Sequence, residues 1–276
     1  MMRFWACALL VTLFGLTACF EPREGCLDIE AVNFDVAADK ECCCCCTYPR
    51  LRLRYRPLFD SLVWKPDTAY EYAPGRWFRL RQAVFYLSAF EFVRDGQTYT
   101  VLDTLSLAVQ TPGGDTVLER FTNDFLLIRR TVAHYPVGEF RQAGKFSSVR
   151  FQVGLPPAAQ HVIPNRAPEN HPLRPQPENL WLGPGRGFAA LQLILTRDTL
   201  PTTPPDTLVF GPPDFPAQTL LSPGPFSHES GYDFDLELWV DFREFFRNVD
   251  LITGDIPAWK TQIWNNLPNA MGVIPK

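Results

Sequence analysis

The side chains of this chain best suited to chemistry are its histidines and cysteines, because imidazole and thiolate are ligands for copper and zinc. Two of the four histidines, His161 and His171, lie in one proline-rich loop that also carries Trp181, and His228 lies in a second proline-rich stretch. The first loop sits between two apolar runs within residues 149–195. A connection of this length without secondary structure is usually functional or disordered, and proline disfavours helix. This loop is therefore the first candidate for a site.

The start of the chain indicates export. In residues 1–18 the basic Arg3 precedes an apolar run that is too short to span a bilayer and is followed by polar sequence. The residues Leu16-Thr17-Ala18-Cys19 resemble the lipobox of bacterial lipoproteins. This resemblance implies cleavage before Cys19, lipid modification of Cys19 and a membrane anchor; the alternative is an ordinary signal peptide. Phe20, in place of Asp, favours an outer-membrane lipoprotein that faces the periplasm or the cell surface.

The cysteines concentrate in the next segment, residues 19–49, which we treat as a cysteine-rich N-terminal module. Residues 25–49 resemble a cysteine-bracketed module of secreted proteins, in which Cys26 is followed by a closing cysteine, here within the run Cys42 to Cys46. Disulfides are the default in an exported chain, so we expect Cys26 to pair with a member of this run. Such a bridge closes a loop of about 16–20 residues, worth about 3 kcal/mol on the loop-entropy model. A thiolate site for Cu(I) or zinc and free or intermolecular thiols remain alternatives, although consecutive cysteines lack the usual zinc spacing.

Composition and motifs exclude several classes of function. Removing residues 1–18 leaves 258 residues and changes the formal charge from −4 to −5 through the loss of Arg3. The chain has no basic stripe, so we expect no nucleic-acid partner. It also lacks Gly-x-Ser-x-Gly, His-Glu-x-x-His and P-loop patterns, and Asp233 and Asp235 lie on a polar strand face. We therefore expect a binding protein rather than an enzyme.

The elements that must position these residues are short strands. From Arg50 to Arg56, apolar residues and arginines alternate, which is typical of a strand with one solvated face. Apolar residues recur every fourth position near the end, which predicts a helix that ends at Pro268. The pattern predicts an all-β fold, an antiparallel sandwich or barrel with long proline-rich loops and a short C-terminal helix, as one domain over residues 50–276. Further strands are expected at 78–92, 99–109, 115–121, 124–130, 146–153, 188–196 and 232–241, and residues 197–230 are expected to form a second long loop.

Several segments of this β domain together resemble the MbnP-like family, the periplasmic copper proteins of methanobactin operons. Their order and spacing match over about residues 50–276, nearly the whole mature chain. The matching segments are Phe85-Tyr86-Leu87-Ser88, Phe151-Gln152-Val153-Gly154-Leu155-Pro156 with Gln160-His161, His171-Pro172-Leu173, Trp181 ahead of Gly187-Phe188, and the tail from Ile263 to Met271.

The resemblance implies a β-sandwich that binds copper through loop histidines. The family's histidine after Gly-x-Pro would be His161, the histidine of its later loop would be His228, and His171 is a possible third ligand. It also implies, for some members, a tryptophan oxidised by a dihaem c-type peroxidase-like partner. Two departures bear on the site: a single Trp181 stands where the family often has two tryptophans, and Thr104-Leu105-Ser106 replaces a family histidine. The alternative is a metal-free binding or structural lipoprotein.

Overall fold

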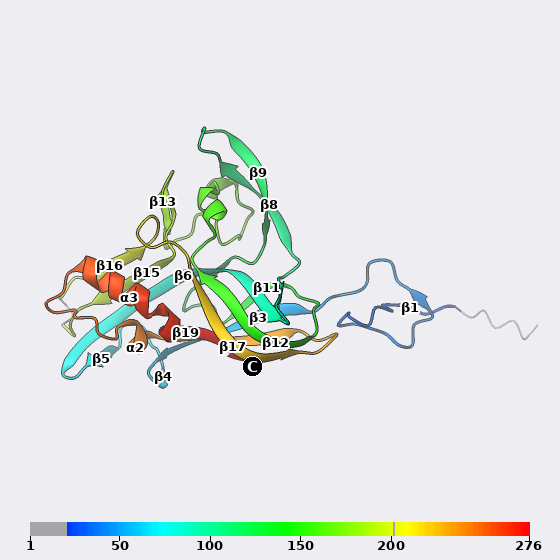
Figure 1. Cartoon of the computed structure of the whole chain (residues 1–276), viewed down its shortest axis with the longest axis horizontal. Coiled ribbons are helices and arrows are strands. Elements are labelled where there is room, and N and C mark those ends of the chain that lie inside the picture. Colours follow the sequence, from blue (N-terminus) through cyan, green and yellow to red (C-terminus); the bar gives the residue numbers. More distant parts are fainter. Residues whose placement is uncertain (1–20, 201) are drawn as a thin grey trace, which may run out of the picture.

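The computed structural model describes residues 21–200 and 202–276, so the predicted signal segment 1–18 and Cys19 lie outside the described residues. Two sheets pack face to face and form a β-sandwich, with helices at one end and a lobe of smaller hairpins above it (Figure 1). In the described ranges, no helix is both long and apolar enough to cross a bilayer.

The larger sheet contains eight strands in which β6 is central, because five strands pair with it directly or through bulges. It contains β5 (Ala69–Ala73), β6 (Arg76–Arg94), β7 (Gln97–Tyr99), β10 (Leu126–Ile128), β12 (Gly144–Val153), β15 (Leu191–Thr196), β16 (Asp206–Phe210) and β17 (Gln218–His228).

The smaller sheet has the order β11-β3-β18-β19, with β4 paired to β3. It contains β3 (Arg50–Phe59), β4 (Leu62–Val63), β11 (His134–Glu139), β18 (Phe234–Asp241) and β19 (Met271–Pro275). The pairs β1 (Glu24–Gly25) with β2 (Lys40–Glu41), β8 (Thr104–Gln110) with β9 (Thr116–Thr122), and β13 (Trp181–Gly183) with β14 (Gly187–Phe188) stand apart. The helical segments are η1 (Pro157–His161), η2 (Pro164–Arg166), α2 (Phe242–Phe245) and α3 (Ile256–Ala270).

Strand β3 confirms the alternation seen in the sequence. Its apolar side chains are buried between the sheets, where the rings of Tyr55 and Phe85 meet edge to face at 6.2 Å between centroids. Its arginines point outward, and two of them pair with acidic side chains of β18: Arg52 with Asp235 at 2.7 Å and Arg56 with Glu237 at 2.9 Å. Such exposed pairs contribute at most about 1 kcal/mol each, so the buried face stabilises this strand.

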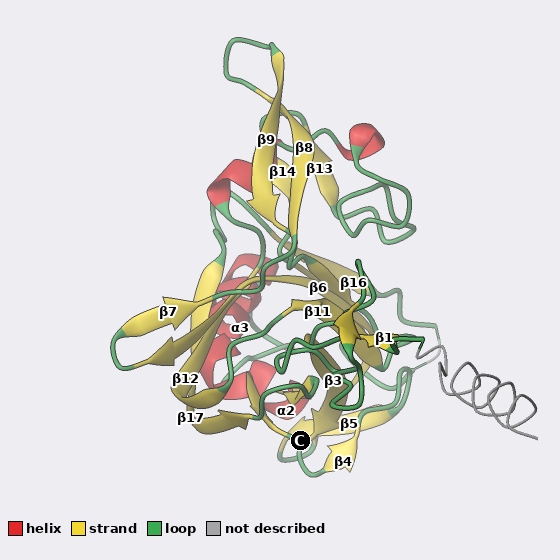
Figure 2. Cartoon of the chain, turned by 90° about the vertical axis from the view of Figure 1, so that its right-hand side faces the viewer, coloured by secondary structure: helices red, strands yellow, loops and turns green. Residues whose placement is uncertain are grey.

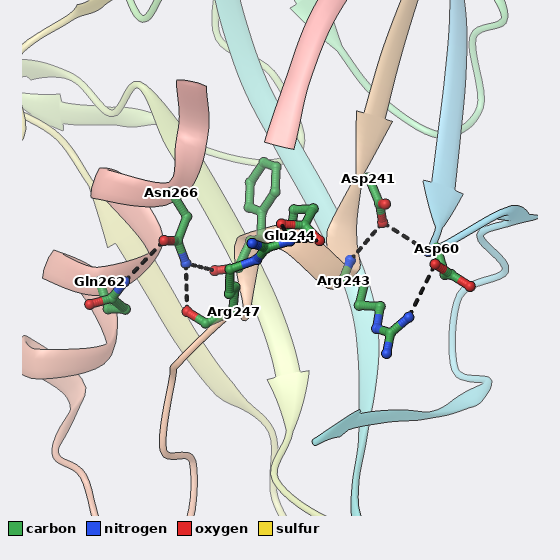
Figure 3. A network of polar contacts seen from close by, with 8 residues as sticks. Asp60, Asp241, Arg243, Glu244, Arg247, Gln262 and Asn266 are labelled. Carbon is green, nitrogen blue, oxygen red and sulfur yellow. Dashed lines mark hydrogen bonds and ion pairs between the residues drawn. The ribbon is translucent and has the colours of Figure 1, made fainter. Parts of the chain in front are cut away.

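A polar network joins the helices to the smaller sheet (Figure 3). The buried Asn266 of α3 donates through Nδ2 to the backbone oxygens of Phe245, at 2.9 Å, and Arg247, at 2.8 Å. At the other end, the Asp241 carboxylate caps α2 by accepting from Arg243 N at 2.9 Å and also accepts from Asp60 N at 2.8 Å. These bonds fix α2 between the end of β18 and α3.

The fold confirms the predicted all-β sandwich class and corrects three details. Strands β3 and β18 pair in parallel, whereas we expected antiparallel pairing throughout. Residues 197–230 form β16 and the long edge strand β17 rather than one loop, because an edge strand tolerates prolines such as Pro223. Helix α3 continues past Pro268 to Ala270, because Leu267 and Ala270 are fully buried and hold the last turn in place.

The proline-rich loop after β12 is ordered and forms a second apolar core on the outer face of β6. Val84 and Tyr86 of β6 pack there against buried loop residues such as Val162, Leu173 and Leu180. The hairpin β8–β9 joins this lobe, because Ile163 N donates to Ala108 O at 2.9 Å. The lobe rises above the sandwich, with β8, β9, β13 and β14 at the top of Figure 2. The loop is therefore held rigidly enough to form a site.

Candidate functional site: a cleft in the upper lobe

The lobe contains a cleft of about 550 Å³. Its walls are the tip of the β8–β9 hairpin, the turns η1 and η2, the segment around Arg174, and the β13–β14 hairpin. Buried Tyr86 and Phe188 lie at its base, and Trp181, whose side chain is 37% exposed, lies on its wall. The volume falls in the usual range for small-molecule sites, about 300–1,000 Å³.

The β13–β14 hairpin is held against η1 by Gln160. The side-chain oxygen of Gln160 accepts from Phe188 N at 2.7 Å, and Gly187 passes so close that a Cβ there would lie 2.3 Å from that oxygen. Gly187 also has φ of +68°, a conformation that L side chains rarely adopt. This position therefore requires glycine, and the contact fixes the wall that carries Trp181.

Of the three predicted histidine ligands, His161 is the one that faces the cleft. It is exposed at the end of η1, and its ring has no hydrogen-bond partner among the described residues. Neither ring nitrogen is therefore held by a contact within the described structure, and the nitrogen with the lone pair is available to a ligand or a metal.

His171 instead has a structural position on the far side of the same loop. Leu173 N donates to its Nδ1 at 3.2 Å, and its Nε2 lies 3.2 Å from Asn123 Oδ1. Nδ1 thus acts as the acceptor and Nε2 carries the proton of a neutral ring. Burial lowers the pKa of His171 to about 4, which keeps the ring neutral at physiological pH.

His228 lies in β17 and is buried, not in a loop as we expected. Its Nδ1 is 2.8 Å from Gln142 O and its Nε2 is 2.7 Å from Tyr232 O. Both ring nitrogens face backbone carbonyl oxygens, so neither is directed at an open position where a metal could bind. The ring of Phe234 stacks on the imidazole at 4.8 Å between centroids.

The structure does not bring His161 and His228 together. His228 pairs with Gly144 at the start of β12, whereas the loop that carries His161 follows Val153 at its other end. A strand of this length spans about 30 Å. A shared metal site would require the loops of His161 and His228 to meet, but the residues near His228 extend strand β17 instead. Within the described ranges, one group of three residues has its potential metal-ligand atoms within 4.8 Å of one another. It consists of Cys42, Cys45 and Cys46.

The cysteine module contains two disulfides, Cys26–Cys46 and Cys42–Cys45. The first is a pairing of the kind predicted from the bracketed motif. Cys43 and Cys44 remain as exposed free thiols with their Sγ atoms 3.5 Å apart. In an extended chain, neighbouring side chains point to opposite sides. Here Cys44 has φ of +69°, and this turn places both thiols on the same side.

Sequence reasoning did not identify the polar lining of the cleft. Arg174 lies in it with no carboxylate partner among the described residues, and three carboxamides, Gln110, Asn165 and Asn179, have no side-chain hydrogen bond there. A signal was present, because the loop combines arginine, amides and Trp181 between its prolines. The pattern could not show which of these side chains converge, since that depends on how the loop packs on β6.

Comparisons with known proteins give one structural similarity. No protein-family model matches the chain, and no curated protein matches it. Among solved structures, the chain is similar to MbnP from Methylosinus trichosporium, with 14% sequence identity and a TM-score of 0.44 over 72% of this chain and 78% of that chain.

Proposed function

We propose that this chain is an exported, membrane-anchored lipoprotein that binds copper as Cu(I). The observation that carries the proposal is the pair of exposed free thiols of Cys43 and Cys44, 3.5 Å apart between two disulfides. Thiolates are the protein ligands that Cu(I) prefers. The proposed membrane anchor is the lipid on Cys19, the first residue of the cysteine-rich module.

The arrangement of the module supports binding at this pair. The two disulfides fix the chain on both sides of Cys43 and Cys44, so the thiols are preorganised and little conformational entropy is lost on binding. Both side chains are exposed, which gives an ion direct access. If Cys42–Cys45 were reduced, the sulfurs of Cys42 and Cys45 could add thiolate ligands, whereas Cys46 would stay in its disulfide with Cys26.

His161 is the histidine that best fits the alternative location of the copper. It lies in the cleft with both ring nitrogens free, whereas His171 and His228 use theirs in internal hydrogen bonds. One imidazole is fewer than the two to four ligands of a usual mononuclear site. The thiol pair is therefore the better-supported site, and variants of each site can distinguish between the two locations.

The test is a Cu(I) titration of the disulfide-bonded protein, against a competing chelator and with ascorbate as the reductant. We expect about one Cu(I) per chain and a loss of affinity of about tenfold or more when Cys43 and Cys44 are both changed to Ser, since serine supplies no soft sulfur ligand. His161→Ala is the matched control and should bind as the wild type does.

Two results would contradict this assignment. Full binding by the double serine variant together with a loss in His161→Ala would place the copper in the cleft. Equally weak binding by all three proteins would leave a metal-free lipoprotein and would overturn the copper function itself.

A further inference from the structure

The cleft in the upper lobe has a charge that differs from the rest of the molecule. The chain has a formal net charge of −4, but no aspartate or glutamate lines the cleft. Its two chargeable basic groups are Arg174 and His161. The Arg174 guanidinium donates once, to Ala167 O at 2.8 Å, and its other N–H groups have no partner among the described residues. A planar guanidinium with free donors is suited to bind a carboxylate through two hydrogen bonds.

The amide side chains of the lining fall into two sets. Gln160 and Gln176 are occupied: Gln160 bonds to Phe188 N, and Gln176 accepts from Arg129 and donates to His171 O. Gln110, Asn165 and Asn179 are exposed and have no side-chain partner in the described part of the chain. Each free carboxamide offers donors and an acceptor on one plane, an arrangement that can bond to neighbouring hydroxyl groups of a ligand.

An aromatic surface completes the cleft. The Trp181 side chain is partly exposed on the wall, while Tyr86 and Phe188 are buried at the base, with Tyr86 Oη donating to Pro172 O at 3.1 Å. An exposed indole offers a flat apolar face with a polar edge. The C–H face of a sugar ring can pack on such a surface while its hydroxyls reach the amides.

From these features we propose that the cleft binds a small acidic saccharide, a uronate of one or two rings. The carboxylate pairs with Arg174, the hydroxyls bond to Gln110, Asn165 and Asn179, and one ring face packs on Trp181. A simple aryl acid would satisfy the guanidinium and the indole but would leave the three amides without partners. The cleft volume of about 550 Å³ accommodates a ligand of this size. This site is separate from the proposed copper thiols, so either proposal can fail alone.

The test is isothermal titration of the full mature chain with digalacturonate, its methyl ester, a neutral disaccharide such as cellobiose, and benzoate. We expect digalacturonate to bind about tenfold or more tightly than its methyl ester, because esterification removes the charge that Arg174 recognises. Benzoate should bind no better than the ester, because it has no hydroxyls for the amides.

Variants locate the binding in the cleft. Arg174→Gln should reduce the affinity for digalacturonate about tenfold and leave the weak binding of the ester unchanged, and Arg174→Lys should restore part of the loss. Trp181→Ala should reduce the affinity for both digalacturonate and its methyl ester. The control is Arg54→Gln, a change at an exposed arginine of β3 that has no ion pair in the described structure. This variant should bind digalacturonate as the wild type does. Thermal unfolding of each variant shows whether it is folded.

The proposal is overturned if digalacturonate shows no binding at millimolar concentration to the folded wild type. It is also overturned if the acid and its ester bind equally, or if benzoate binds and the saccharides do not. If digalacturonate binds and Arg174→Gln and Arg54→Gln weaken it to the same extent, the interaction is a general charge effect and not recognition in this cleft.

Discussion

At the scale of single residues, the histidines differ in what their ring nitrogens already contact. Geometry alone separates a free ring at His161 from the fully bonded rings of His171 and His228. The sequence could not distinguish these rings by their contacts, because partners such as Gln142 O and Asn123 are distant along the chain. A buried neutral histidine makes the stability of the fold depend on pH, whereas an exposed histidine does not.

His171 should make the fold sensitive to acid. Its pKa is about 4 in the folded protein and about 6.5 in an unfolded chain. The stability associated with its neutral form is therefore complete above pH 6.5 and is lost as the pH falls towards 4, by on the order of 3 kcal/mol. Denaturant unfolding from pH 7.5 to 4 should show a shallower decline in His171→Gln than in the wild type. His134→Gln, a change at an exposed histidine, should keep the wild-type slope.

Asp124 acts in the opposite direction over part of this range. Burial raises its pKa to about 6, so its ionised form costs stability above pH 6 and this cost disappears as the pH falls towards 3.8. The quantity to measure is therefore the difference in the free energy of unfolding between the wild type and His171→Gln at each pH. The contribution of Asp124 cancels in this difference. If that difference does not change between pH 7.5 and 4, the burial of a neutral His171 does not control acid stability.

At the scale of elements, the buried polar side chain of Asn266 joins α3 to the end of α2. Asn266 satisfies the backbone oxygens of Phe245 and Arg247 at the end of α2, and Gln262 Nε2 donates to Asn266 Oδ1 at 3.0 Å (Figure 3). Buried carbonyl groups without a donor are costly. The asparagine-rich tail of the sequence thus contains one structural asparagine beside an exposed one, Asn265.

Asn266→Ala should destabilise the protein by about 2 kcal/mol, because two buried oxygens lose their donor. For a domain of this size, this corresponds to a fall in Tm of roughly 4–8 °C. Asn265→Ala, the adjacent position on the solvent side of the same helix, should change Tm by little. Calorimetry of the two variants measures both effects, and equal shifts would show that the network does not stabilise α3.

The sequence predicted the elements whose burial follows a regular period. Alternating apolar residues predicted β3 and β18, and a long run rich in aromatic residues predicted β6. The Thr-Pro-Gly-Gly sequence between two expected strands predicted the turn of the hairpin β8–β9. It did not predict β17, whose prolines obscure the alternation, or the parallel pairing of β3 with β18, which is non-local. The cleft escaped prediction for the same reason, because its lining converges through packing on β6.

At the scale of the whole molecule, the cysteine module projects from one side of the sandwich (Figure 1). It contacts the domain at a few points, such as Arg141 over the Tyr48 ring at 3.2 Å and Ser230 Oγ donating to Ile29 O at 3.4 Å. Its disulfides stay within residues 26–46. The module can therefore separate the proposed lipid on Cys19 from the domain without being part of its core.

Cys19→Ala should release the protein from the membrane to the soluble fraction without changing its thermal unfolding, because the anchor is at the first residue of the module and the core lies after the module. Fractionation of cells that produce the wild type and the variant measures the release, and calorimetry of the purified domain measures the unfolding. A variant that stays with the membrane after a high-salt wash would contradict lipid anchoring.

The parallel pairing of β3 with β18 also determines when the domain can fold. Strand β3 is the first strand of the domain to be synthesised, yet its neighbour β18 and the adjacent β19 are the last. The smaller sheet cannot assemble until almost the whole chain has emerged, and contacts this distant in sequence form slowly. During this delay the apolar faces of β3 and β6 have no partner sheet and are prone to aggregation, so a chaperone that holds the emerging chain would increase the yield of folded protein.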